Sequence, residues 1–189
     1  MKLSVLPTID TCQVLELPKI VDARGNLTFV EKQRHVPFDI KRIFYLYDVP
    51  TAADRGAHAH KRQHQFLICL SGSFDVEVND GTDTRMIHLN RPWKGLHVPP
   101  MIWAAEKNFD PGSLCLVLAS DLFSEDDYIR DYDAYVLTRK MSGGPRRKPR
   151  EPRERRQRQE RREQAWTGLP APVSAQEKAA AGTTPGTAG

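Results

Sequence analysis

The sequence has no apolar run long enough to cross a membrane. Its 189 residues have a mean hydropathy of −0.56, and no stretch approaches the roughly 20 apolar residues of a transmembrane helix. The first seven residues also lack the apolar segment of a signal peptide. We therefore expect a soluble, cytoplasmic protein that does not bind membranes.

Cysteines are scarce and are not spaced as a redox or metal motif. The chain has three, Cys12, Cys69 and Cys115, an odd number without a Cys-x-x-Cys pair. Two of them lie inside apolar runs. This pattern argues against a disulfide framework and predicts reduced thiols in the core, as is usual in the cytoplasm.

Helical periodicity is also scarce before residue 120. Short alternating or apolar segments are separated by turn residues instead, which favours a β-sandwich or barrel. The first helical turn is expected at residues 124–129, with Ser124 as its cap. The expected strands cover residues 14–21 as a pair, 27–31, 40–47, 55–70, 74–78, 84–89, 95–103 and 114–119.

Charge is unevenly distributed along the chain. Residues 1–139 contain 16 Lys and Arg against 19 Asp and Glu, whereas residues 140–189 contain 12 against 5. The second segment has too few large apolar side chains to offset the chain entropy lost on folding. We expect one folded domain over residues 1–139 and a disordered basic tail over residues 140–189. Nucleic-acid binding by this tail is disfavoured, because glutamates interrupt the basic run and stacking aromatics are not interleaved with it.

Two histidines provide the strongest chemical signal. On a strand, His58 and His60 project from the same side, with Ala59 facing away. Imidazoles titrate near neutrality, so this pair is suited to proton transfer or to metal binding. Two surface histidines are the alternative, which is disfavoured because the strand runs into five apolar residues, 66–70, that need burial on both faces.

The spacing around these histidines resembles the first motif of the cupin superfamily, in which His-x-His is followed by an acidic residue and a glycine. Here Gln65 replaces the acidic residue, and Gly72 is the glycine. In the run that matches the second motif, residues 99–104, Ala104 stands where a third metal histidine is expected. The resemblance implies a jelly-roll barrel. The two missing ligands imply that it works without a metal or other cofactor.

A closer resemblance covers nearly all of residues 10–137. The chain is similar to the sugar-nucleotide 3,4-ketoisomerases that act on dTDP-4-keto-6-deoxy-hexoses. Many of these relatives carry a histidine directly after the tryptophan, so Ala104 leaves the configuration at C4 of the product open. The matching segments are 22–27, 37–42, 55–61, Gln65 with 72–73, 80–81, 95–96 ahead of Pro100 and Trp103, 118–120 and 127–130.

The resemblance implies that the protein moves the keto group of dTDP-4-keto-6-deoxyglucose from C4 to C3 in deoxyamino-sugar biosynthesis. This reaction needs a base for the C3 proton, stabilisation of an enediol or enediolate, and return of a proton at C4. We predict His60 as the base and His58 as the relay between the oxygens, or the reverse.

Several further residues are candidates for binding the substrate. Guanidinium and ammonium groups suit the diphosphate, and aromatic rings suit the sugar or thymine. Surface charge or core packing is the alternative for each of them. The candidates are Arg24, Arg42, Tyr45, Arg55, Lys61, Gln65 and Trp103.

Two other functions stay open at this point: a dTDP-sugar 3,5-epimerase of the same superfamily, and a non-catalytic cupin that binds a sugar nucleotide. A metal-dependent dioxygenase is disfavoured by Gln65 and Ala104. The relatives are dimers, and strands over residues 14–21 and 27–31 would leave open edges unless a partner pairs with them. We therefore expect a two-fold homodimer with strand exchange.

Overall fold

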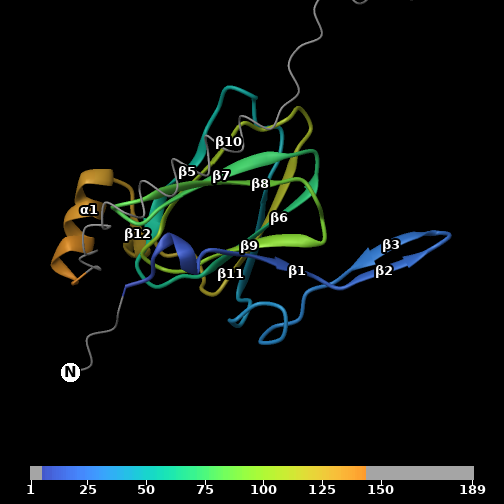
Figure 1. Ribbon diagram of the computed structural model, residues 1–189, viewed down its shortest axis with the longest axis horizontal. Helices are drawn as coiled ribbons and strands as arrows, with labels where there is room; N and C mark the ends of the chain where they lie inside the picture. The colour runs from blue at the N-terminus through green and yellow to red at the C-terminus, as the bar shows by residue number, and fades with distance from the viewer. Residues whose placement is uncertain (1–5, 144–189) are drawn as a thin grey trace, which may run out of the picture. The chain divides into compact units, whose positions relative to one another are not determined.

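The computed structural model describes residues 6–143, which all belong to one compact unit. Two five-stranded sheets, in which every strand pair is antiparallel, face each other (Figure 1). A separate two-stranded hairpin, β2 (Lys19–Asp22) with β3 (Gly25–Thr28), extends away from them.

The strands of the two large sheets come from distant parts of the sequence. The first sheet, in spatial order, is β1 (Gln13–Glu16), β9 (Lys94–Val98), β6 (Gln65–Ser71), β11 (Leu114–Ala119) and β4 (Arg42–Leu46). The second is β12 (Tyr128–Ile129), β5 (Arg55–His60), β10 (Trp103–Lys107), β7 (Phe74–Asn79) and β8 (Thr84–Leu89). The helical elements are the 3₁₀ helices η1 (Ile9–Thr11) and η2 (Glu125–Asp127) and the α-helix α1 (Tyr132–Met141).

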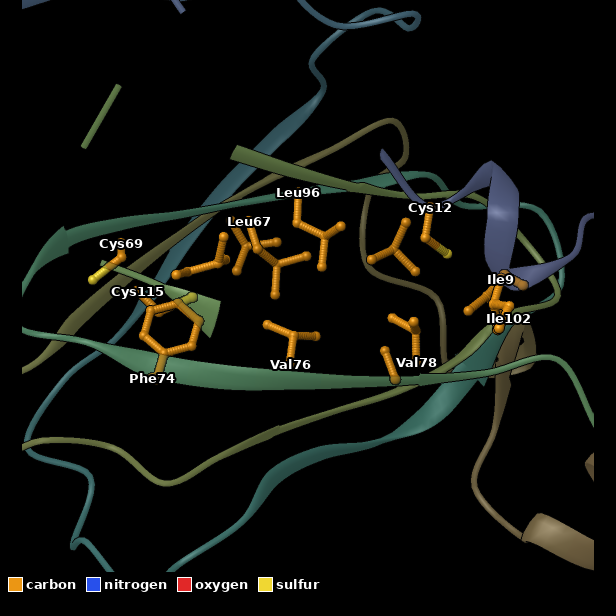
Figure 2. Packing of buried hydrophobic residues seen from close by; sticks show 14 of the residues in the cluster. Ile9, Cys12, Leu67, Cys69, Phe74, Val76, Val78, Leu96, Ile102 and Cys115 are labelled. Atoms are coloured by element: carbon orange, nitrogen blue, oxygen red, sulfur yellow. The ribbon is translucent and has the colours of Figure 1, made fainter. Parts of the chain in front are cut away.

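The main core lies between the two sheets. In β7, Phe74, Val76 and Val78 are buried and alternate with half-buried polar residues, as the two-residue period of a strand requires. They pack against residues of the first sheet such as Leu67 and Leu96 (Figure 2). The predicted all-β jelly-roll barrel is confirmed.

The cysteine prediction is also confirmed. Cys12, Cys69 and Cys115 are free thiols, and all three are buried in this core (Figure 2). Burial raises the pKa of Cys12 to about 12 and keeps the pKa of the other two thiols above its usual value. The three thiols therefore stay protonated and act as small apolar side chains.

Strand β6 is buried on both faces, as predicted. Leu67 faces the main core, whereas Phe66 and Ile68 face a second cluster with Val36 and Phe38, from the segment between β3 and β4. This segment covers the outer face of the first sheet over β6 and β11.

The stretch of residues 55–70 is two strands in two different sheets, so the prediction of one continuous strand is wrong. The backbone N–H of Lys61 donates to the carbonyl oxygen of Asp127 (2.8 Å). The N–H groups of Arg62 and Gln63 donate to its carboxylate (2.9 and 3.2 Å). Because Asp127 accepts all three hydrogen bonds, these N–H groups cannot pair with a neighbouring strand. The chain therefore leaves the second sheet here and crosses to the first. Residues 95–103 divide in the same way, since β9 ends before Pro99 and β10 begins at Trp103.

The helical content differs from the prediction. Residues 124–129 form only the 3₁₀ helix η2 and β12, and the Ser124 side chain makes no capping hydrogen bond. Helix α1 was not predicted. It begins after Asp131, whose side chain accepts a hydrogen bond from the Ala134 N–H (2.7 Å) and so caps the helix.

Helix α1 packs against the outer side of the second sheet at its β12 end (Figure 1). Its Tyr135 is fully buried against Trp103 and Ile129. The helix ends at Met141, so the predicted domain boundary after residue 139 falls within its last turn. The predicted tail lies outside the described residues from position 144 onward. Within the described chain, no helix has the length and apolarity needed to span a membrane.

Candidate active site

Strand β5 places His58 and His60 on the inner face of the second sheet. Their Nε2 atoms are 3.1 Å apart, and the two rings meet edge to face. The side chain of His60 is only 5% exposed. His58 is half-buried. The two imidazoles therefore lie side by side on one face of the strand, as its alternation predicted.

Asp127 orients His60 through Nδ1, the ring nitrogen that does not face His58. Its Oδ2 lies 3.0 Å from Nδ1 of His60, and both side chains are buried. A carboxylate can only accept a hydrogen bond, so Nδ1 of His60 carries the proton and Nε2 has a free lone pair. The position follows from strand pairing, because Tyr128 of β12 lies opposite His60 and Asp127 directly precedes it.

The backbone of β5 orients His58 in the same sense. Its Nδ1 contacts the carbonyl oxygen of Gly56, which also can only accept a hydrogen bond. In the neutral pair, both Nε2 lone pairs thus face each other with room for one proton between them. A proton taken by one imidazole can pass directly to the other.

Burial keeps both imidazoles neutral. It lowers the pKa of His58 to about 4, and the charge that His60 would carry is the second cause. Burial also lowers the pKa of His60, although the hydrogen bond to Asp127 and its negative charge act in the opposite direction. At neutral pH the pair is ready to accept a proton.

Two glutamine amides approach the same nitrogen of His60. The Nε2 atoms of Gln63 and Gln65 lie 3.2 and 3.1 Å from it. The guanidinium of Arg42 on β4 donates to Oε1 of Gln63 (3.1 Å). The structure therefore brings the predicted residues Arg42 and Gln65 to the histidine pair.

The segment around η2 forms one wall of the site. The ring of Tyr128 lies 4.8 Å from the ring of His58 and 4.3 Å from that of His60, and the guanidinium of Arg130 lies 4.3 Å from the Tyr128 ring. The ammonium group of Lys61 donates to the Asp126 carbonyl oxygen (2.6 Å). The predicted residue Lys61 thus anchors this wall beside the histidines.

The two predicted aromatic residues do not reach the pair. Trp103 lies opposite Ala59 on the outer face of the second sheet, where it packs against Tyr135 of α1. Tyr45 is 60% exposed on the outer face of β4, next to Tyr47. Neither ring contacts the histidine pair in the described chain, and their contact with the sugar or thymine stays a prediction.

Two predicted arginines also lie elsewhere in the described chain. Arg55 begins β5 and His60 ends it, a separation of roughly 16 Å along an extended strand. Arg24 is in the turn of the β2–β3 hairpin, where it pairs with Asp22 (2.9 Å) and its side chain is 91% exposed. Neither contributes to the histidine site within one chain.

The donor set at the site favours proton transfer over metal binding. Ala104 lies opposite His58 on β10 and offers only a methyl group. Across residues 6–143, no three His, Cys, Asp or Glu side chains are grouped so that they could hold one ion. What remains is two neutral imidazoles, a carboxylate behind one of them, and amide and guanidinium donors.

Three site residues were not predicted from the sequence: Gln63, Asp127 and Tyr128. Asp127 and Tyr128 lie in a segment that carried the family resemblance, but Asp127 is 67 residues from His60 and no local pattern joins the two. Gln63 lies in the crossing between β5 and β6, which was predicted as continuous strand.

Known proteins are similar to this chain in sequence and in fold. A TDP-4-oxo-6-deoxy-alpha-D-glucose-3,4-oxoisomerase from Aneurinibacillus thermoaerophilus is 42% identical over 123 residues, which cover 65% of this chain and 88% of that protein. The crystal structure of a 3,4-ketoisomerase from Helicobacter canadensis is 42% identical with a TM-score of 0.66, covering 67% of this chain and 96% of that one.

A further solved structure contains a sugar nucleotide. It is a variant of the 3,4-ketoisomerase QdtA from Thermoanaerobacterium thermosaccharolyticum in complex with TDP-4-keto-6-deoxyglucose, and it is 38% identical with a TM-score of 0.67. The match covers 69% of this chain and 94% of that one. These similarities confirm the resemblance predicted from the sequence. The family described as FdtA: WxcM-like, C-terminal matches residues 10–140, and this chain therefore belongs to that family.

Proposed function

We propose that the protein is a 3,4-ketoisomerase that converts TDP-4-keto-6-deoxyglucose into the corresponding 3-keto sugar nucleotide. The relatives named above support the reaction and the substrate. The observation that carries the proposal is the His58–His60 pair, with its Nε2 atoms 3.1 Å apart and the Asp127 carboxylate against Nδ1 of His60. The relatives give less support to the alternatives, a 3,5-epimerase or a non-catalytic binding protein.

The pair can carry every proton of the reaction. Nε2 of His60 takes the C3 proton, and the electrons of the C3–H bond form the C3=C4 bond of an enediolate. His58 moves a proton between the oxygens on C3 and C4, and a proton returned to C4 leaves the carbonyl at C3. The hydrogen atoms and electrons balance within the substrate, so no oxidant or reductant is consumed.

Arg42 is the proposed contact for the diphosphate. The buried Nε atom of Arg42 has no hydrogen-bond partner among the described residues. Leaving a buried donor unpaired costs about 1–3 kcal/mol, and a phosphate oxygen would satisfy it in a charge-assisted hydrogen bond. Lys61, which directly follows His60 and is held by the Asp126 carbonyl oxygen, would add a second positive charge.

The test of the proposed function is His60→Asn. Turnover of TDP-4-keto-6-deoxyglucose should fall by at least about a hundredfold, as expected for loss of an acid–base residue, while TDP binding is retained. His88→Asn is a matched control, since His88 pairs with Asp75 on the outer part of the barrel. Product analysis in D₂O should show deuterium at C4. Label at C5 would indicate an epimerase, and failure of the wild-type protein to turn over the sugar would refute the proposal.

The proposed assembly is a two-fold homodimer formed through the N-terminal strands. The β2–β3 hairpin leaves Ile20, Val21 and Leu27 more than half exposed, and a partner would bury this apolar surface. A solution mass of one chain at micromolar concentration would contradict the dimer. We place the enzyme in the cytoplasm, where the three free thiols would remain reduced, and assign it to the biosynthesis of deoxyamino sugars.

A further inference from the structure

The Nε2 atom of His60 is surrounded by more hydrogen-bonding groups than it can use at once. The nitrogens of His58, Gln63 and Gln65 all lie 3.1–3.2 Å from it. The proton on Nδ1, held by Asp127, leaves Nε2 with one lone pair. A group that donates a hydrogen bond to this lone pair changes how readily Nε2 of His60 takes up a proton.

Arg42 fixes the orientation of Gln63. A guanidinium group can only donate, so the amide oxygen of Gln63 must face Nη2 of Arg42 (3.1 Å). The amide NH₂ group then faces Nε2 of His60 (3.2 Å). Gln63 is 2% exposed and its backbone N–H donates to Asp127, so the side chain has little freedom to turn over.

We propose that Gln63 is a positioning residue: held by Arg42, it donates to Nε2 of His60 and maintains that nitrogen in the unprotonated form that acts as the base. This inference rests on the proposed function only for the role of His60 as the base. The hydrogen-bond chain itself, from Arg42 through Gln63 and His60 to Asp127, follows from the geometry.

The other charged and titratable groups around His60 both raise and lower its pKa. Asp127 of η2 favours the protonated imidazole, whereas Arg42 of β4 and Arg130 after β12 disfavour it. His58 of β5 and the ring of Tyr128 of β12 complete the surroundings. Gln63 adds a donor that stabilises only the neutral form, and such a hydrogen bond lowers the proton affinity of the acceptor.

The decisive experiment is a ¹⁵N NMR titration of the histidine ring nitrogens in the full chain, without substrate. Gln63→Glu replaces the donor with an acceptor and a negative charge. The titration midpoint of His60 should rise by at least about one pH unit. Gln13→Glu is the matched control, because it makes the same chemical change on the exposed face of β1 and should leave the midpoint unchanged.

A second variant keeps the proposal testable if Gln63→Glu does not fold. Gln63→Leu removes the donor without adding charge, and the midpoint of His60 should rise by about half a unit to one unit. In the active enzyme, the acid limb of the kcat/KM profile should move by the same amount in each variant.

The outcomes separate this inference from the proposed function. A midpoint in both Gln63 variants equal to that of wild type would overturn the role of Gln63, whether or not the enzyme turns over the sugar. A shifted midpoint in a wild-type protein without ketoisomerase activity would refute the proposed function and leave the hydrogen-bond chain intact.

Discussion

Glu106→Gln should stabilise the protein, and the gain should depend on pH. Glu106 lies on β10 and is 6% exposed. Its carboxylate lies so close to Gly56 that a Cβ atom added there would be 2.3 Å from Oε2. Burial raises the pKa of Glu106 from 4.5 to about 7, and the hydrogen bond to its own backbone and the positive charge of Arg55 only partly offset this effect.

The sign and size of the effect follow from these two pKa values. Between pH 4.5 and about 7 the folded protein holds the Glu106 proton more tightly than the unfolded chain, so stability falls as pH rises through this window. A pKa unit corresponds to about 1.4 kcal/mol. The native carboxyl therefore costs about 3 kcal/mol above pH 7, and a neutral glutamine of the same shape removes this cost.

Urea unfolding of wild type and Glu106→Gln at about pH 8 and about pH 4.5 measures the effect. The variant should be more stable by about 3 kcal/mol at the higher pH, a gain on the order of 10 °C in Tm, and equal to wild type at the lower pH. Glu16→Gln is the control, since Glu16 forms an exposed ion pair with Lys94 that contributes about 0–1 kcal/mol. The reasoning is refuted if Glu106→Gln is no more stable than wild type at pH 8, or gains equally at both pH values.

Two further predictions concern the site and the tail. Asp127→Asn should lower turnover at least about tenfold with an unchanged circular dichroism spectrum. The reason is that an amide no longer holds the proton on Nδ1 of His60. Turnover at the wild-type rate would show that Asp127 does not orient the base. A chain truncated after Gly143, beyond the end of α1 at Met141, should keep its Tm and turnover, because residues 144–189 carry too little apolar surface to pack on the barrel. A loss of either at every salt concentration would place the tail in the working fold.

The barrel and the histidine pair could be predicted because both depend on local periodicity. Alternation in β7 and the apolar run of β6 indicated which faces are buried. The two-residue spacing of His58 and His60 placed both imidazoles on one side of a strand, whatever the strand pairs with. The predictions failed where the chain stops being a strand, at residues 61–64 and 99–102, because hydrogen bonds from distant residues end the ladder there.

The sequence by itself determined the fold class, the family and the pair of imidazoles, since periodicity and motif spacing are properties of neighbouring residues. Only the tertiary structure decided which other side chains meet that pair. It brought in Asp127 through the pairing of β12 with β5 and placed Trp103 on the opposite face of the same sheet. Register between distant strands depends on the packing of the whole barrel, and a shift by one residue would exchange the two faces. For this reason, the partners of His60 could not be predicted from local sequence.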